Sequence, residues 1–481
     1  NTKKNLFIRL AQKEIKKYSY LMKKILTIIS ILIFSTSAYA NNRLNGFNKW
    51  LFENGYSEYV EKTVKELCKD EPKYSVVWYY NNCDQPKYKN NLNIKFYDYT
   101  SWLPEETEKP NFDTLLFELY KYTYSPYRDK PTVHVYEVKP SKKPYKFKSK
   151  LKDDKYIDKQ LEKTALLSYL RFEDNKITID KFTPDNRFGK FINKDTKLRS
   201  MSAGKTMVSY VVGHAICDGY IESINSRLND WPLLENTLYF DTKLIDILNM
   251  KSGDREYIVG SDLSSTVDKS LINQKFRGLD DYALDLQKYM LLFKNTKKSK
   301  THFNYSGINP TIALNYVLFK TGDDFEKILE KTFKKKAKIK DSVIFWKVKN
   351  SSKERGNANI MFYATRYDYL RIAKAMLDDW RKDTCVGKYL KTIFDNRIDK
   401  ENEKRNKEGR PAQYRYARGY AGQFQAHYKG ISKKRAIMGM HGRGGQHIVI
   451  DFENSRIVAT NAIYEDFNFK RIVYDPIRKG K

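Results

Sequence analysis

The fold of this chain is decided at Arg199-Ser200-Met201-Ser202-Ala203-Gly204-Lys205-Thr206, directly ahead of a run with helical periodicity. The apolar residues of that run recur at intervals of three and four, the spacing of one buried helix face, at Met207, Val208, Val211, Val212, Ala215 and Ile216. Ser202 therefore lies at the helix start and Lys205 one turn further on. Side chains at i and i+3 lie about 5–6 Å apart at Cβ, so the hydroxyl and the amine can share a hydrogen bond. The pair predicts a serine nucleophile with a base beside it.

Two other interpretations of this stretch have to be weighed. Gly204-Lys205-Thr206 also ends a nucleotide phosphate-binding loop, but that motif needs a glycine five positions before Gly204, where Arg199 stands. Ser-x-x-Lys also occurs by chance on many helices, with the serine acting only as an N-cap. The four residues alone do not exclude this second interpretation.

Length and composition indicate a globular protein. The 481 residues are 41% hydrophobic and 14% aromatic, enough for a sizeable core and about two domains. The formal charge of +32 raises nucleic acid or a membrane surface as a partner. The lysines are scattered, however, and no nucleic-acid-binding signature accompanies them, so we expect no nucleic-acid partner. An acidic substrate or an envelope polymer stays an open alternative as the partner of the basic chain.

The first forty residues have the pattern of an export signal. Lys23-Lys24 precede an apolar run from Ile25 to Phe34 and a small-residue end at Ala38-Tyr39-Ala40. We expect a signal peptide at 22–40, cleaved after Ala40, behind an upstream extension at 1–21. The apolar run is too short to span a bilayer comfortably, so the predicted mature protein is periplasmic or secreted and has no integral membrane span.

Four cysteines are compatible with that location. Cys68 and Cys83 lie in one small segment and could pair. Cys217, on the predicted helix after Ser202, is expected to be a buried free thiol, and Cys385 has no obvious partner.

The chain is expected to divide near residue 150, where a lysine-rich stretch follows Pro140 to Pro144. Residues 41–150 then form a small N-terminal domain of unknown role, and residues 151–481 a catalytic domain. Apolar runs at 164–172 and 176–182, separated by Glu173-Asp174-Asn175, predict a hairpin. Further strands are expected at 435–440, 447–451 and 456–463. The predicted fold is therefore α+β, an α/β sandwich whose antiparallel sheet comes from both ends of the domain, with a helical insert between them.

Further sequence motifs, taken together with Ser-x-x-Lys, resemble those of a known family. Ser202-Ala203-Gly204-Lys205, Gly213 to Ile221 and Thr242 to Gly253 resemble, in order and spacing, the serine β-lactamase and penicillin-binding-protein superfamily, in its class C-like branch. Phe303-Asn304-Tyr305-Ser306-Gly307 resembles the Tyr-x-Asn element, and His441-Gly442-Arg443-Gly444-Gly445-Gln446 the glycine-rich motif of the sheet-edge strand. The Gly-Gly-Gln ending and the helix from Tyr363 to Arg371 are most similar to 6-aminohexanoate-oligomer hydrolases and esterases.

The resemblance implies a β-lactamase/transpeptidase-like fold and an acyl-enzyme mechanism. Ser202 is the implied nucleophile, Lys205 the base and Tyr305 the third member of the proton relay. The backbone N–H groups of Ser202 and Arg443, with Gly444 as the alternative donor, are the implied oxyanion hole. His441 and Gly442 belong to the same substrate strand, His441 being open between strand packing and substrate contact. His214 is expected to be a satisfied helix histidine.

Two departures from the family's motifs narrow the range of expected substrates. The family's Lys-Thr-Gly is absent, and Gly307 stands where the Tyr-x-Asn element has its amide. We therefore expect a serine hydrolase that acts on a small amide, ester or peptide-like substrate without cofactor or metal. The alternatives are a D,D-peptidase or β-lactamase on the same scaffold, and a non-catalytic envelope-binding protein that keeps the fold.

Overall fold

The computed structural model describes most of the chain from residue 44 onwards, in the ranges 44–63, 87–95, 109–124, 133–255, 257–258, 286–299, 301–348, 358–400 and 416–479. Within these ranges, no helix is both long and apolar enough to cross a membrane. The predicted extension, the predicted signal peptide, Cys68 and Cys83 lie outside the described residues.

The chain divides into two compact units. Of the described residues, 44–63, 87–95 and 110–120 belong to unit 1, and 109 and those from Lys121 onwards belong to unit 2. This division falls earlier than the boundary expected near residue 150. The physical reason is strand pairing, because two strands that precede residue 150 pair with strands of unit 2.

Unit 1 is small and aromatic. Residues 44–53 are helical, β1 (Val60–Thr63) pairs antiparallel with β2 (Lys87–Asn90), and α3 (Phe112–Tyr122) runs from this unit into the start of unit 2. Phe47 is fully buried and meets the Phe117 ring edge-on at a centroid distance of 5.3 Å.

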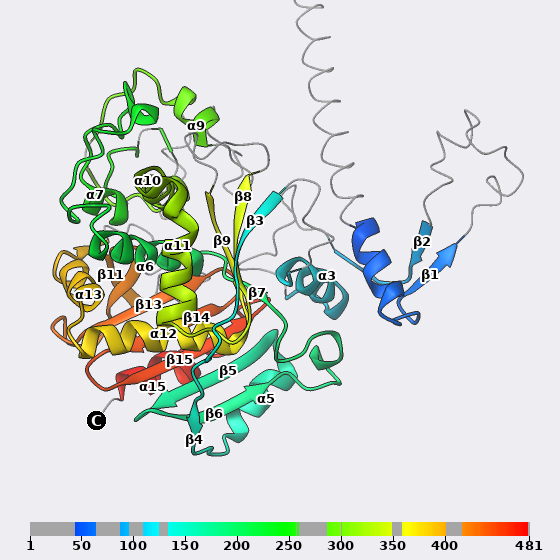
Figure 1. Cartoon of the computed structure of the whole chain (residues 1–481). Helices are drawn as coiled ribbons and strands as arrows, with labels where there is room; N and C mark the ends of the chain where they lie inside the picture. The colour runs from blue at the N-terminus through cyan, green and yellow to red at the C-terminus, as the bar shows by residue number, and fades with distance from the viewer. Residues whose placement is uncertain are drawn as a thin grey trace, which may run out of the picture. The chain divides into compact units, whose positions relative to one another are not determined.

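Unit 2 is built on a nine-stranded sheet in the order β10-β11-β12-β13-β14-β15-β5-β6-β4 (Figure 1). Neighbouring strands are antiparallel except β4 and β6. The strands are β4 (Lys148–Ser149), β5 (Leu166–Glu173), β6 (Lys176–Phe182), β10 (Ile398–Asp399), β11 (Ala417–Ala421), β12 (Phe424–Tyr428), β13 (Ile437–Gly442), β14 (Gln446–Asp451) and β15 (Arg456–Ala462). The predicted sheet from both ends of the domain is confirmed, and β15 pairs with β5 where the two ends meet.

Local sequence explains the β5–β6 hairpin. Asp174 and Asn175 form its turn with φ angles of 47° and 62°. Two consecutive residues at positive φ make the turn whose twist matches antiparallel strands, and Asp and Asn tolerate that conformation well. The hairpin predicted from Glu173-Asp174-Asn175 therefore forms as expected.

A second, four-stranded sheet has the order β3-β8-β9-β7 and carries the approach to Ser202. Its strands are β3 (Val133–Val138), β7 (Leu198–Arg199), β8 (Val343–Val348) and β9 (Ala358–Ala364). β7 ends three residues before Ser202, so the position of Ser202 depends on the pairing of β7 with β9.

Helices cover both faces of the large sheet. One face packs against α6 (Ala203–Cys217), since Met207 and Val211 share a core with Met438 and Ile448 of the sheet. The opposite face packs against α5 (Lys155–Lys163) and the C-terminal segments η7 (Lys470–Tyr474) and α15 (Asp475–Arg478). The remaining helical segments are η2 (Gly189–Phe191), η3 (Pro232–Leu234), α7 (Leu244–Leu248), α9 (Leu286–Leu292), α10 (Ile308–Thr321), η5 (Gly322–Asp324), α11 (Phe325–Leu329), η6 (Glu330–Lys336), α12 (Arg366–Arg381) and α13 (Cys385–Asp395).

The helix after Ser202 is more deeply buried than its periodicity predicted. Every residue of α6 from Ala203 to Ala215 is buried, not only one face. The helix packs against the large sheet and also against α10, α13 and β9, so little of its surface reaches solvent. Gly204 permits the closest of these contacts, because a Cβ there would stand 2.1 Å from the Ile360 carbonyl oxygen of β9.

The expectation of a free thiol at Cys217 is wrong. Cys217, the last residue of α6, forms a disulfide with Cys385, the first residue of α13, at a Cα–Cα distance of 5.8 Å. The two cysteines lie 168 residues apart, so only the packing of α6 against α13 makes them neighbours.

Candidate active site

A turn with one left-handed residue presents Ser202 at the start of α6. Met201 has a φ of 48°, a conformation that residues other than glycine adopt only when their surroundings hold them there. The holding contacts come from β9, because the Ser200 N–H donates to the Phe362 carbonyl at 2.8 Å and the Phe362 N–H donates to Ser200 Oγ at 3.2 Å. The turn is therefore fixed by the small sheet.

Ser202 and Lys205 are joined by a hydrogen bond. Lys205 Nζ donates to Ser202 Oγ at 3.1 Å, as the i, i+3 spacing predicted. The lysine is only 6% exposed, and no carboxylate of the described residues lies within ion-pair distance of it. A buried amine next to a serine hydroxyl, without an acidic partner, is the arrangement in which a lysine can serve as a base.

Tyr305 completes this group from the helical insert. Lys205 Nζ lies over the Tyr305 ring, 4.7 Å from its centroid. The ring is 8% exposed and packs in a small cluster with Met250, Phe303 and Tyr420, Tyr420 meeting it edge-on at 6.0 Å. Tyr305 thus lies together with the Ser202–Lys205 pair, although about a hundred residues separate it from them in the sequence.

A buried carboxylate holds the segment that carries Tyr305. Asp254, fully buried, accepts hydrogen bonds from Asn304 Nδ2 at 2.8 Å, Asn309 Nδ2 at 3.0 Å and the Tyr239 hydroxyl at 3.1 Å. Burial raises the pKa of Asp254 above its ordinary value, and these hydrogen bonds oppose that shift. Sequence reasoning missed Asp254, although its place directly after Ser252-Gly253, in a block already assigned to the family, was an available signal.

The glycine-rich motif reaches the same turn from the large sheet. Gly442, the last residue of β13, lies so close that a Cβ there would stand 2.4 Å from the Ser200 carbonyl oxygen and 3.0 Å from Met201 Cβ. Within the described part of the chain, the Ser202 N–H has no hydrogen-bond acceptor. Gly442 therefore lies against the turn that presents Ser202, and Arg443 follows it in the chain.

The strand that bears this motif is not a sheet edge as expected. β13 pairs with β14 along its length and with β12 on its other side. Pairing with β12 is limited to Met438 and Gly439, however, so among the described residues the end of β13 from Met440 to Gly442 has no strand partner on that side. The local geometry is that of an edge, although the strand lies inside the sheet.

His441 points away from Ser202. Its neighbours Met440 and Gly442 face the turn and α6, whereas the His441 ring lies on the other face, against Tyr428, His447 and Phe469. Its Nε2 lies 2.6 Å from the Tyr428 hydroxyl and its Nδ1 lies 2.7 Å from His447 Nδ1. Burial lowers the pKa of His441 well below its ordinary value, with further lowering by His447 and Lys400. Of its two open roles, the geometry favours strand packing.

His214 is buried but not satisfied. Among the residues that the structure describes, neither ring nitrogen has a hydrogen-bond partner, and the ring packs edge-on against Tyr210 at 4.9 Å. Burial lowers the pKa of His214 to about 4, so the ring is neutral near pH 7. Within the described residues, no three His, Cys, Asp or Glu side chains are grouped as a metal site would require.

Unit 2 has the β-lactamase/transpeptidase-like fold, and it carries the Ser202–Lys205 pair at the start of α6. The chain is similar to the solved structure of a putative 6-aminohexanoate-dimer hydrolase from Bacillus anthracis, with a TM-score of 0.54 and 12% identity over 75% of this chain and 92% of that one. The predicted resemblance is thereby confirmed at the level of the fold.

Two other solved structures have lower TM-scores. A putative β-lactamase from Bacteroides dorei gives 0.46 and 17% identity over 64% of this chain and 87% of that one. A D-stereospecific amidohydrolase from Streptomyces sp. gives 0.45 and 12% identity over 69% of this chain and 100% of that one. No protein-family model and no curated protein matches the sequence.

Proposed function

We propose that this protein is a serine hydrolase that cleaves amide or ester bonds through an acyl intermediate on Ser202. The observation that carries the proposal is the 3.1 Å hydrogen bond from buried Lys205 to Ser202 Oγ, with the Tyr305 ring beside the same amine. A chance Ser-x-x-Lys on a helix does not require a buried amine and an aromatic partner from a distant segment.

In the proposed mechanism, Ser202 Oγ attacks the carbonyl carbon of the substrate while its proton passes to Lys205. The carbonyl oxygen becomes an oxyanion that accepts hydrogen bonds from the Ser202 N–H and the Arg443 N–H, with Gly444 as the alternative donor. Removing one such donor costs about 2.7–4 kcal/mol of transition-state stabilisation. The leaving amine or alcohol takes a proton through Lys205 and Tyr305, and water then releases the acyl group.

The proposed substrate is a short amide or ester of the kind that the name 6-aminohexanoate-dimer hydrolase implies for the Bacillus anthracis protein. The missing Lys-Thr-Gly lysine supports this choice over a β-lactam or a peptidoglycan stem. His441 does not replace that lysine, because its ring packs on the other face of the sheet.

The test is active-site labelling of the full chain with a fluorophosphonate probe and, separately, with a fluorescent penicillin. We expect the fluorophosphonate to label the protein, the Ser202→Ala variant to stay unlabelled, and a chromogenic short-chain ester to be turned over. Rapid stoichiometric penicillin labelling at Ser202 would instead favour a D,D-peptidase or β-lactamase. Absence of fluorophosphonate labelling in the folded protein would favour a non-catalytic binding protein.

We also propose that the protein is exported. The disulfide between Cys217 and Cys385 supports this, because disulfides persist mainly in oxidising compartments. N-terminal sequencing of the protein from its native host is expected to begin at Asn41, and a mature form that retains residues 22–40 would contradict the proposal.

A further inference from the structure

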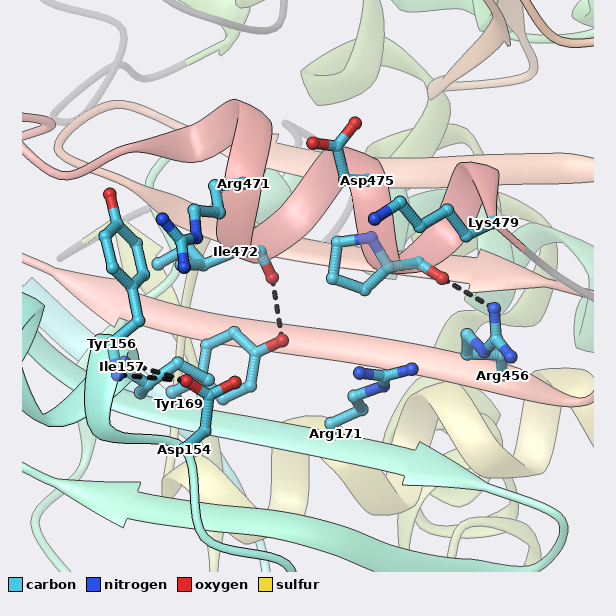
Figure 2. Close-up of a pocket in the computed structure, with 11 residues that line it drawn as sticks. Asp154, Tyr156, Ile157, Tyr169, Arg171, Arg456, Arg471, Ile472, Asp475 and Lys479 are labelled. Atoms are coloured by element: carbon cyan, nitrogen blue, oxygen red, sulfur yellow. Dashed lines mark hydrogen bonds between the residues drawn. The ribbon is translucent and has the colours of Figure 1, made fainter.

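A hollow lies on the face of the large sheet opposite the face covered by α6. It has a volume of about 250 Å³ and is bordered by α5, β5, β15 and the C-terminal segments η7 and α15 (Figure 2). Four of its lining residues are cationic, namely Arg171, Arg456, Arg471 and Lys479, and two are acidic, Asp154 and Asp475.

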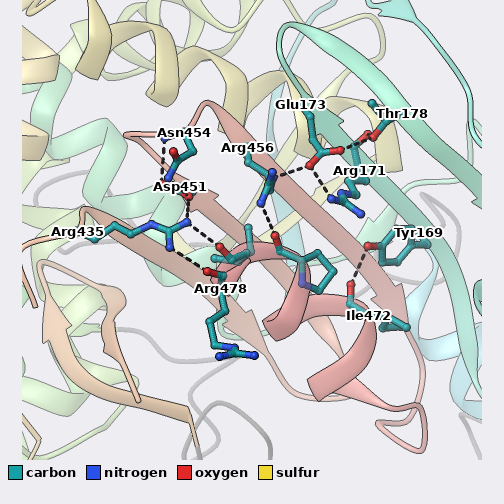
Figure 3. A network of polar contacts seen from close by, with 12 residues as sticks. Tyr169, Arg171, Glu173, Thr178, Arg435, Asp451, Asn454, Arg456, Ile472 and Arg478 are labelled. Atoms are coloured by element: carbon teal, nitrogen blue, oxygen red, sulfur yellow. Dashed lines mark hydrogen bonds and ion pairs between the residues drawn. The ribbon is translucent and has the colours of Figure 1, made fainter. Parts of the chain in front are cut away.

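The register of two strands builds its floor. Arg456 of β15 pairs directly opposite Glu173 of β5, and Arg171 lies two residues before Glu173 on the same face. Glu173 Oε1 lies 2.6 Å from both Arg456 Nε and an Arg171 terminal nitrogen. Figure 3 shows these contacts within the surrounding polar network. One carboxylate therefore stands against two guanidinium groups, and the floor keeps one unit of positive charge.

The rim adds two cations that have no acidic partner. The Arg471 guanidinium stacks on the Tyr156 ring at 3.6 Å from the centroid, and the Lys479 amine is exposed at the end of α15 (Figure 2). Within the described residues, neither side chain makes a hydrogen bond or an ion pair. Stacking on Tyr156 restrains the guanidinium while its N–H groups stay available.

The acids at the hollow are too few to balance these cations, because Glu173 and Asp154 are the two carboxylates without an ion pair outside it. Asp154 uses Oδ1 to accept from the N–H groups of Tyr156 and Ile157 at the start of α5. Asp475 forms ion pairs with Lys470 at 3.3 Å and Arg478 at 3.6 Å, neither of which lines the hollow. The cations on floor and rim are thus in excess.

We propose that this hollow binds a small phosphate monoester. Guanidinium groups recognise phosphate oxygens through paired charge-assisted hydrogen bonds, and a phosphate monoester carries enough negative charge to be shared between floor and rim. Ile157, Ile472 and Pro476 provide apolar wall for the ester group. At about 30 Å³ per water molecule, the volume equals roughly eight waters, which suits a phosphate with a short or single-ring substituent.

The test is calorimetric titration of the full chain with phenyl phosphate and, separately, with inorganic phosphate. We expect saturable one-to-one binding of phenyl phosphate and weaker binding of inorganic phosphate. The double variant Arg471→Gln/Lys479→Gln is expected to weaken phenyl phosphate binding about tenfold or more, because both rim cations are lost.

The matched control is Arg381→Gln/Lys382→Gln, which removes one arginine and one lysine that are likewise exposed and lie outside the hollow. It is expected to change the dissociation constant about twofold at most, through the net charge alone. Absence of saturable binding, equal weakening in both double variants, or equal affinity for inorganic phosphate would each overturn the proposal. Because the hollow lies on the face of the sheet opposite the face covered by α6, none of these results depends on hydrolase activity.

Discussion

Replacing Asp254 with alanine removes a buried acceptor that three donors share. The donors are Asn304 Nδ2 at 2.8 Å, Asn309 Nδ2 at 3.0 Å and the Tyr239 hydroxyl at 3.1 Å. Asn304 directly precedes Tyr305, so the change is expected to loosen the segment that brings the tyrosine to Lys205.

The magnitude follows from the three hydrogen bonds that are lost. At about 1–3 kcal/mol each, they set a gross upper bound of roughly 3–9 kcal/mol. The low end applies, because Asn304 Nδ2 still donates to the Ile258 carbonyl and Asn309 Nδ2 to Ser306 Oγ. Part of this loss is offset, because a carboxylate whose pKa is raised by burial no longer has to be kept in the interior. We expect a net loss of about 3 kcal/mol, at the lower end of that range.

The assay combines a thermal melt with ester turnover at a temperature where the variant is folded. An unfolding entropy of about 2.1 cal/mol/K per residue, over the roughly 360 residues from Lys121 to Lys481, turns about 3 kcal/mol into a fall in Tm of roughly 4 °C. Turnover is expected to fall well beyond the unfolded fraction, because Tyr305 is no longer held beside Lys205.

The control is Asp195→Ala, which removes an exposed carboxylate 3.3 Å from Lys340. Exposed ion pairs contribute about 0–1 kcal/mol, so this variant is expected to keep its Tm and its turnover. If Asp254→Ala matched the control in both measurements, the inference that Asp254 positions Tyr305 would be refuted.

Three further predictions concern stability. Serine at Cys217 and Cys385 is expected to cost about 3–5 kcal/mol in denaturant unfolding, because the disulfide closes a loop of 168 residues; an unchanged midpoint would contradict this. His214 has a lowered pKa of about 4 in the folded protein, so between about pH 4 and 6.5 the unfolded chain binds more protons than the folded one. The free energy of unfolding is therefore expected to fall by about 3 kcal/mol as the pH drops through that window. His214→Phe should remove this part of the pH dependence. Gly204→Ala is expected to cost about 1–3 kcal/mol of stability and to lower ester turnover, because the new Cβ meets the Ile360 carbonyl oxygen and must displace α6. An unchanged Tm and an unchanged rate of ester turnover would show that α6 does not rest against β9.

Local chemistry made much of the fold predictable. Asp174 and Asn175 accept positive φ, which made the β5–β6 hairpin predictable. Ser202 and Lys205 are one helical turn apart, so their hydrogen bond follows from helix geometry alone.

Contacts between distant segments could not be predicted from the sequence. Cys217 and Cys385 meet because two helices pack, and no spacing in the sequence encodes that meeting. The direction of the His441 ring could not be predicted either. A strand places alternate residues on opposite faces, so an uncertainty of one residue in the register of the glycine-rich motif leaves the face undecided.

The sequence by itself predicted the Ser202–Lys205 pair and the β5–β6 hairpin, because these depend on periodicity and on turns of a few residues. Only the tertiary structure decided which side chains complete the site. It brought Tyr305 to Lys205, placed Asp254 beneath the Tyr305 segment and gathered four cations on the far face of the sheet. Such groups form from residues that are far apart in the sequence. The packing of the whole core brings them together.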